Sequence, residues 1–170
     1  MKIIEAMKKV KYNKEKLSEL HGKIKDNCAN TTLESPIYGD DVHLKIKEWI
    51  QSCADIVQEN VRLLCAIQKT NSQTNVTIEL DGKKVTKTVS EWVWRRREYA
   101  RYDQITWSML SDRGLQQGAF KSSLGADVRV DIVRHFDPIE RDKMQEVYRS
   151  EPHNIDSALE IINAITDLVE

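Results

Sequence analysis

Two long segments of the chain repeat apolar residues at alternating steps of three and four, and this spacing constrains the fold more than any other feature. In residues 3–27 the repeating positions are Ile3, Met7, Val10, Lys14, Leu17, His21 and Ile24. In residues 42–69 they are Ile46, Trp49, Cys53, Ile56, Asn60, Leu63 and Ile67. Such spacing keeps one stripe of a helix against a partner helix. The two segments are therefore predicted to pair as an antiparallel helical hairpin.

Polar residues interrupt both stripes. Asn60 could fix the register of the pair, or it could face solvent if the stripe is rotated. Lys14 and His21 are interpreted as edges of the first stripe, because a long lysine stem can cover apolar surface. The connecting sequence CANTTLESPIYGDD holds a proline and a glycine that end the first helix, and Asp40 or Asp41 can cap the second near residue 42.

A β-hairpin is predicted at residues 75–87. Asp81-Gly82 is a dipeptide that accepts positive φ at both centres of a type I′ turn, and Val, Ile and Thr flank it. Val76, Ile78 and Leu80 alternate with polar residues, so one face of the ribbon is apolar. Because an isolated two-stranded hairpin is marginally stable, this face needs a platform, either helix ends or another subunit.

A third helix is predicted at residues 89–111. Thr88 and Glu91 have the spacing of a capping box, in which each side chain satisfies a free backbone amide at the start of the helix. Three of the four tryptophans fall in this segment, and Gly114 and Gly118 follow it.

The last third predicts a strand and two helices. Residues 127–133 alternate like a strand that could join the free edge of the hairpin in a three-stranded sheet. Asp137 can cap a helix at 138–150 that begins with Pro138. Glu151-Pro152 is expected to interrupt or kink it, and residues 153–168 form a final amphipathic helix.

Composition places the whole chain in the mainly α class. Its 170 residues, 40% of them hydrophobic, suit a single helical domain spanning 1–170. Charged residues make up 31%, whereas there are only 6 Gly and 3 Pro, a balance that favours exposed long helices. The expected architecture is an antiparallel coiled-coil bundle with a small β insertion. The net charge of −1 provides no global attraction to nucleic acid or to an anionic membrane.

Neither a metal, a cofactor nor a membrane is expected as a partner. Cys28, Cys53 and Cys65 are odd in number and lack metal-ligand spacing, which favours a reducing compartment such as the cytoplasm. The four histidines form no pair at helical spacing. No run approaches the ~18 apolar residues of a membrane span, so the chain is expected to be soluble.

The sequence WVWRRREYAR is the one patch that invites a binding function. Its arginines could bind phosphates and its aromatic rings could stack on bases. Consecutive helical residues point about 100° apart, however, so the arginines cannot form one cradle. Ion pairs with Glu98, Asp103 or acids of neighbouring helices or subunits are the preferred interpretation. The residues predicted to contact a subunit or nucleic acid are Trp92, Trp94, Arg95, Arg96, Arg97, Arg101 and Trp107.

No catalytic arrangement is predicted. The sequence RVDIVRHFDPIERDK loosely resembles strand-borne nuclease sites, but Asp137 is better explained as a helix cap and no second acidic motif accompanies it. No Ser/His/Asp arrangement or phosphate-binding glycine loop is present in the sequence. A non-enzymatic protein is therefore expected.

The middle of the chain resembles the septicolysin-like family, small helical proteins of bacteria and their phages with a domain of unknown function. The family pattern is I-x-x-T-N-x-x-T, then D-G-x-x-(L/V)-T, then an arginine-rich helix. The matching residues are Ile67, Thr70, Asn71, Thr74, Asp81, Gly82, Val85 and Thr86. The first and last helices also resemble the family's, whereas the tryptophans of the third helix and Glu151-Pro152 depart from it. The resemblance implies a helical protein that forms homo-oligomers and supplies no catalytic residues.

These observations lead to two hypotheses. The first is a structural or assembly protein that forms homo-oligomers, with the turn at Asp81-Gly82 and the third helix available for subunit contacts. Its specific version is a virion or prophage component with other virion proteins as partners, found in the virion or the cytoplasm. The alternative is a nucleic-acid-binding module that uses the arginines between residues 95 and 101.

Overall fold

The computed structural model describes residues 1–169 and is mainly α-helical with a small β insertion, as predicted. It has two small antiparallel hairpins, of which only the first was predicted. Its elements, in order, are α1 (Ile3–Asn27), the short 3-10 helix η1 (Gly39–Asp41), α2 (Val42–Gln73), β1 (Asn75–Leu80), β2 (Lys83–Thr88), α3 (Val89–Trp94), the π-helical turn η2 (Arg95–Tyr99), α4 (Ala100–Ser108), β3 (Gly118–Lys121), β4 (Asp127–Val130) and α5 (Pro138–Ile165). Contacts divide the chain into two compact units, Met1–Thr74 with Glu160–Glu170, and Asn75–Leu159. That the whole chain is a single domain stays a prediction.

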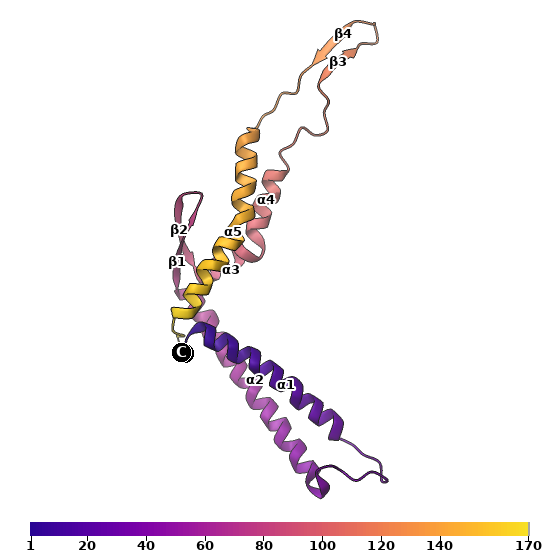
Figure 1. The fold of residues 1–170 in the computed structure, drawn as a ribbon, viewed down its shortest axis with the longest axis vertical. Helices are drawn as coiled ribbons and strands as arrows, with labels where there is room; N and C mark the ends of the chain where they lie inside the picture. The colour runs from indigo at the N-terminus through magenta and orange to yellow at the C-terminus, as the bar shows by residue number, and fades with distance from the viewer. Residues whose placement is uncertain (170) are drawn as a thin grey trace. The chain divides into compact units, whose positions relative to one another are not determined.

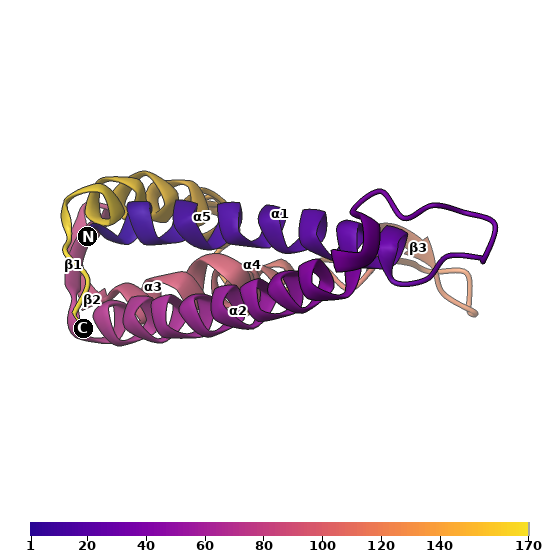
Figure 2. The ribbon, with the colours of Figure 1, turned by 90° about the horizontal axis from the view of Figure 1, so that it is seen from below.

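The first unit is built on the predicted antiparallel pair of α1 and α2, which lie side by side (Figure 1, Figure 2). The stripe predicted for α2 is correct: Ile56, Asn60 and Leu63 are buried, and the burial continues to Thr70. Ala6, Val10 and Leu63 form the core of the pair, with Ile67 and Leu168 packed against it. α2 extends beyond the predicted end at residue 69 to Gln73, and Thr70 in this extension is buried.

The stripe predicted for α1 is wrong at every second position. Met7, Lys14 and His21 are exposed, and the residues that precede them in sequence, Ala6, Asn13 and Leu20, are buried. The steps of three and four are retained, but they run through Ile3, Ala6, Val10, Asn13, Leu17, Leu20 and Ile24. Asn13 therefore faces Asn60, and its amide donates to the Asn60 oxygen at 2.9 Å and to Glu59 at 2.9 Å. The buried asparagine of α2 is satisfied by a second asparagine on α1.

The two ends of the first unit meet in an isolated β-bridge between Lys2 and Asp167. The Ile3 amide donates to the Thr166 carbonyl at 3.0 Å, and the Leu168 amide donates to the Met1 carbonyl at 2.9 Å. The Val169 amide also donates to the buried Thr70 hydroxyl at 2.9 Å. These bonds hold the segment that follows α5 against the start of α1 and the end of α2.

The predicted hairpin of the second unit is confirmed as β1 and β2, which pair with Ile78 opposite Val85. Asp81 and Gly82 have φ of 49° and 72°, the positive values that the turn requires. The platform for the apolar face comes from the same unit. Trp92 of α3 is fully buried and donates its indole N–H to the Val76 carbonyl at 2.9 Å. Neighbouring subunits are thus not needed to cover this hairpin.

The third helix begins as predicted but does not run unbroken to residue 111. The Thr88 hydroxyl accepts from the Glu91 amide at 3.2 Å, and the Glu91 carboxylate accepts from the Thr88 amide at 2.7 Å, which confirms the capping box. After α3 the chain forms the π-helical turn η2 and then α4, which ends at Ser108. A π-helical turn inserts one residue into the helix and rotates the faces that follow it.

Two predictions for the last third are wrong. The strand at 127–133 does not join the first hairpin: β4 pairs with β3, Phe120 opposite Val128, in a separate two-stranded sheet. The helices predicted at 138–150 and 153–168 are one helix, α5, which continues through Pro152 and is bent along its length (Figure 1). Proline removes one backbone bond without stopping the helix, because packing on both sides of it sustains the remaining ones. The predicted cap is confirmed by the Ile139 amide, which donates to Asp137 at 2.8 Å.

Candidate interaction surfaces

The centre of the second unit is an ion-pair cluster around Arg95. Arg95 donates Nε and Nη2 to the two carboxylate oxygens of Glu151 at 2.7 and 2.6 Å, and Nη1 to Asp103 at 2.5 Å. The Glu151 side chain is only 1% exposed. Tyr148 adds a ring face 5.8 Å from the guanidinium. These bonds, those with Glu151 first, raise the pKa of Arg95 above its ordinary value, so the guanidinium remains charged.

The η2 turn places Arg95 so that it reaches both carboxylates. Asp103 lies on α4 and Glu151 on α5, and the arginine between them ties three helical segments together. Glu151 is not among the predicted site residues, because Glu151-Pro152 is interpreted from the sequence only as a helix-breaking dipeptide. The available signal was its position: four residues before Ile155 and eight before Leu159, it shares their buried helix face.

The other arginines of the motif do not converge with Arg95. Arg96 forms an ion pair with Asp156 of α5. The Arg97 guanidinium lies 6.0 Å from the ring centre of Trp94, and Arg101 is exposed. The preference for ion pairs with Asp103 and with acids of a neighbouring helix is therefore confirmed for Arg95 and Arg96. Two of the four arginines have their charge matched by carboxylates.

The tryptophans of the motif divide between the core and the surface. Trp92 is core and Trp107 is partly buried, whereas Trp94 is exposed. Exposed apolar and aromatic side chains continue from Trp94 along η2 and α4, and together they define the aromatic strip: Trp94, Tyr99, Tyr102, Ile105 and Met109. Tyr and Trp, with Arg and Met, are the residue types enriched where proteins bind one another. Of the predicted contact residues, only Trp94 belongs to this strip, whose composition suits a protein partner.

The first unit carries a second apolar stripe on the outer face of α2. Ile50, Ala54, Val57, Val61 and Leu64 again follow steps of four and three, and we call them the outer stripe. Its four large residues are 48–56% exposed, whereas Ile56 and Leu63 on the inner stripe are 8% and 3% exposed. Gln51, Gln58 and Cys65 flank the outer stripe, so no charged side chain stands on that border. The sequence pattern of α2 is therefore that of a helix with partners on two sides, but within this chain only its inner stripe is covered, by α1.

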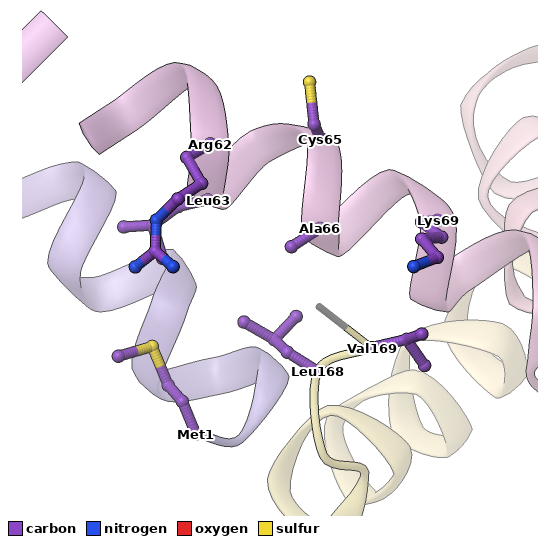
Figure 3. A pocket seen from close by; sticks show the side chains of 8 residues that line it. All are labelled: Met1, Arg62, Leu63, Cys65, Ala66, Lys69, Leu168 and Val169. Carbon is purple, nitrogen blue, oxygen red and sulfur yellow. The ribbon is translucent and has the colours of Figure 1, made fainter. Parts of the chain in front are cut away.

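The first unit also holds an apolar pocket of about 310 Å³ beside the start of α1 (Figure 3). Leu63, Ala66 and Leu168 form its apolar wall, and Arg62 and Lys69 stand at opposite ends. The Cys65 sulfur points away from the other labelled side chains in Figure 3. Cys28, Cys53 and Cys65 are all free thiols.

Among residues 1–169 no group of three or more His, Cys, Asp or Glu side chains is arranged to hold a metal ion. Within the same residues, none of the helices combines the length and apolarity needed to cross a bilayer.

No family model matches the chain, and no curated protein is detectably similar to it in sequence. The resemblance to the septicolysin-like family therefore stays a prediction. In fold, the chain is similar to the crystal structure of a functionally unknown conserved protein from Corynebacterium diphtheriae, with a TM-score of 0.59, 18% sequence identity and coverage of 99% of both chains. At this identity the likeness establishes the fold alone.

Proposed function

We propose that this protein is a non-enzymatic assembly component that acts by binding further copies of itself, with the outer stripe of α2 as the main interface. The single observation that carries the proposal is surface area. The chain exposes 12597 Å². Two separate compact units, each of half this chain's length, would expose only about 10,400 Å² together by the usual scaling of surface with mass. The surplus of about 2,200 Å² per copy exceeds the roughly 1,000 Å² that each partner contributes when an obligate homodimer buries 2,000 Å² in total.

The pattern of the outer stripe favours a second helix of the same kind as its occupant. A repeat of threes and fours is the seam of a helical bundle, and the same helix already uses such a seam to bind α1. Since glutamines and a cysteine border the outer stripe, two copies of α2 can approach without bringing like charges together. The aromatic strip is a second surface for subunit contacts.

Two copies packed through their α2 helices would form a four-helix arrangement from two α1–α2 hairpins. A structural component of a virion or prophage particle is the specific version of this proposal, and it rests on the family resemblance. The three free thiols suit assembly in a reducing cytoplasm.

The alternative, a nucleic-acid-binding module, has less support from the arginine geometry. Arg95 and Arg96 are engaged with carboxylates, which leaves Arg97 and Arg101 as the exposed cations of the motif without a carboxylate partner in the contacts described above. Retention on DNA that falls steeply with salt and is lost in Arg97→Ala/Arg101→Ala would favour this alternative.

Native mass spectrometry and light scattering across micromolar concentrations test the proposal. The wild-type protein should form a discrete homo-oligomer. Val57→Asp or Val61→Asp should yield monomers, because each substitution buries an unpaired charge in the interface between the two α2 helices. Ser18→Asp, which adds the same charge at an exposed position of α1, is the control and should leave the oligomer intact. A wild-type monomer at these concentrations would refute the proposal.

A further inference from the structure

Residues 111–137 of the second unit form an extended segment, here called the arm, that carries β3 and β4 beyond the ends of α4 and α5 (Figure 1). Its base is fixed by Arg134, which donates Nε and Nη2 to the two oxygens of Asp112 at 2.6 Å each. This bidentate pair lowers the pKa of Asp112. Arg141 of α5 also donates to the Leu110 carbonyl at 3.1 Å. The arm is thus anchored at its base, where the chain leaves α4 and where it enters α5.

One face of the arm is apolar and uncovered. In the β3–β4 register Phe120 lies opposite Val128 and Gly118 opposite Val130, so these residues share a face, while Arg129 and Asp127 belong to the other. Phe120, Val128 and Val130 are 41–46% exposed. The corresponding residues of the first hairpin, Val76 and Ile78, are 5–6% exposed. The two hairpins have the same two-sided pattern, and only the first has its platform within the unit.

The outer edge of β4 is also open, because the sheet has two strands. The Ser122 amide donates to the Ala126 carbonyl at 2.8 Å, which identifies Ser122 and Ala126 as a hydrogen-bonded pair. In an antiparallel ladder such pairs alternate with pairs whose backbone groups point away from each other. It follows that Asp127 and Arg129 direct their N–H and C=O groups outward, at the free edge, where another strand can bind them.

We propose that this edge binds the same edge of a second copy, so that β4 pairs antiparallel with its own counterpart about a two-fold axis at Val128. The inference rests on the proposed self-association and assigns a second contact to it. Centring on Val128 places Asp127 opposite Arg129 of the other copy, and Arg129 opposite its Asp127. Two opposite-charge cross-strand pairs result, and both lie at positions whose backbone groups face the partner.

The neighbouring registers that satisfy the same backbone bonds are disfavoured by charge. Centring the pair on Asp127 would set two aspartates opposite each other, and centring it on Arg129 would do the same for two arginines. The latter register would also place Asp127 opposite Asp131 of the second copy. Like charges directly opposite each other destabilise a sheet. Charge therefore favours the Val128 register over these two. A pair centred on Val130 would instead set Arg129 opposite Asp131 of the other copy, and a thiol at residue 130 distinguishes that register from the one centred on Val128. The contact is isologous, as a two-fold interface requires.

The product would be a four-stranded sheet. In the Val128 register the two copies present Phe120, Val128 and Val130 on one continuous face, because residues opposite each other in a ladder share a face. Four strands with a shared apolar face are more stable than an isolated hairpin. The open edges of the two arms are thus paired with each other, and their apolar faces join into one larger face.

Disulfide formation tests directly which residues of the two β4 strands lie opposite each other. In a background with Cys28→Ser, Cys53→Ala and Cys65→Ser, Val128→Cys places two thiols opposite each other at the two-fold axis, in the closer type of cross-strand pair. Mild oxidation should convert this variant to a disulfide-linked dimer. Val130→Cys is the matched control: its thiols would lie about 13 Å apart along the strands and should not link. Equal linking of both variants, or of neither, would overturn the inference.

Charge reversal provides a second test. Arg129→Asp creates two acidic pairs and should raise the dissociation constant for joining arms at least about tenfold, as measured by sedimentation velocity. The triple variant Lys121→Glu/Asp127→Arg/Arg129→Asp restores opposite charges between copies and keeps an opposite charge across from residue 127 within the hairpin, so it should recover assembly. Glu79→Lys, on the outer face of β1, is the control for a charge reversal of equal size and opposite sign.

The outcomes separate the two proposals. A wild-type monomer refutes the proposed function and this inference together. An oligomer that Arg129→Asp leaves unchanged, with no Val128→Cys disulfide, refutes only the arm contact. The same pair of negative results is expected if the arm instead enters a lipid bilayer or holds a different protein, so either occupant would overturn the inference. Circular dichroism of each variant confirms that it is folded, and the disulfide test stands if a charge variant is not.

Discussion

Arg95 and Glu151 are separated by 56 residues in sequence and are joined by two parallel hydrogen bonds of 2.7 and 2.6 Å. Glu151 is almost completely shielded from water, and Arg95 is its bidentate partner. A buried carboxylate without a partner is costly because it loses its hydration and gains nothing in return. The helix α5 therefore depends on a residue of the η2 turn.

Removal of Arg95 should destabilise the protein strongly. We expect Arg95→Ala to lower the free energy of unfolding by about 3 kcal/mol, the lower end of the range for breaking a buried ion pair, because Arg95 itself is partly open to water. Arg134→Ala breaks another bidentate pair, with Asp112, but that pair is exposed to water, so the loss of stability should be much smaller. Urea unfolding followed by circular dichroism measures both. Equal losses would contradict the role assigned to burial.

Substitution of the buried asparagines should separate stability from specificity. Asn60→Leu leaves the Asn13 amide with Glu59 alone and should cost about 1–2 kcal/mol. The double variant Asn13→Leu/Asn60→Leu removes both buried polar groups and should be at least as stable as the wild type, with a mixture of oligomeric states. Thermal unfolding and native mass spectrometry check the two effects. A double variant that keeps a single oligomeric state would argue against the asparagine pair as a determinant of register.

Loss of the indole donor should loosen the first hairpin. Trp92→Phe keeps a large ring in the core but leaves the Val76 carbonyl without its bond of 2.9 Å, so we expect a loss of about 1–3 kcal/mol. Faster amide hydrogen exchange should appear in β1 and β2. Trp94→Phe, at an exposed position of the same short helix, should change stability by less than about 0.5 kcal/mol. Unchanged exchange in β1 would show that the indole bond does not hold the hairpin.

Stability should fall in acid, below about pH 4.5. The backbone amide and hydroxyl of Thr88 lower the pKa of Glu91 from 4.5, and the amide of Asn13 lowers that of Glu59. A carboxyl whose pKa is lower in the folded than in the unfolded protein contributes stability above the unfolded value, and the contribution disappears as the pH falls through the folded value. The urea midpoint should therefore fall as the pH drops below the unfolded values.

The variant Glu91→Gln should weaken this acid dependence, because the group that titrates at the helix start is gone. Glu79→Gln, on the outer face of the hairpin, is the matched control for loss of one carboxylate. Should Glu91→Gln retain the full wild-type decline, the capping carboxylate would not be a source of the acid sensitivity.

Features whose signal is contained in a few adjacent residues could be predicted from the sequence. The turn at Asp81-Gly82 and the capping box at Thr88 and Glu91 are such features, since their chemistry is local. The long stripe of α2 was also predictable, because a helix that buries one face over several turns repeats its signal many times.

The stripe of α1 was assigned wrongly because it has two neighbouring solutions. Met7, Lys14 and His21 satisfy the same spacing as Ala6, Asn13 and Leu20, and hydrophobicity alone favours Met7 over the small Ala6. What decides between them is the partner: only the second set brings Asn13 opposite the buried Asn60. A polar residue is stable in a seam when another polar residue can form a hydrogen bond with it. The partner lies on the other helix, so the pattern of one helix alone does not reveal it.

The last third could not be predicted because tertiary contacts decide it. Pro152 weakens a helix locally, but Glu151 beside it is held by Arg95 from another helix, and this contact helps to keep α5 continuous. Similarly, β4 has no local feature that chooses between the first hairpin and β3. Gly118 to Lys121 was too short and too weakly patterned to be identified as a strand, and with β3 missed, the pairing of β4 was assigned to the wrong partner.

The asparagine pair inside the α1–α2 hairpin has a consequence for the loop that connects the two helices. A slide of one heptad would move Asn13 away from Asn60 and set it opposite Cys53 or Ile67, where its amide would lose the Asn60 oxygen. The buried asparagine pair thus sets the alignment of α1 and α2, and the length of the linker at residues 28–41 is not needed to set it. Insertions, deletions or a grafted epitope there should alter the tip of the hairpin while the same side chains continue to meet along its length.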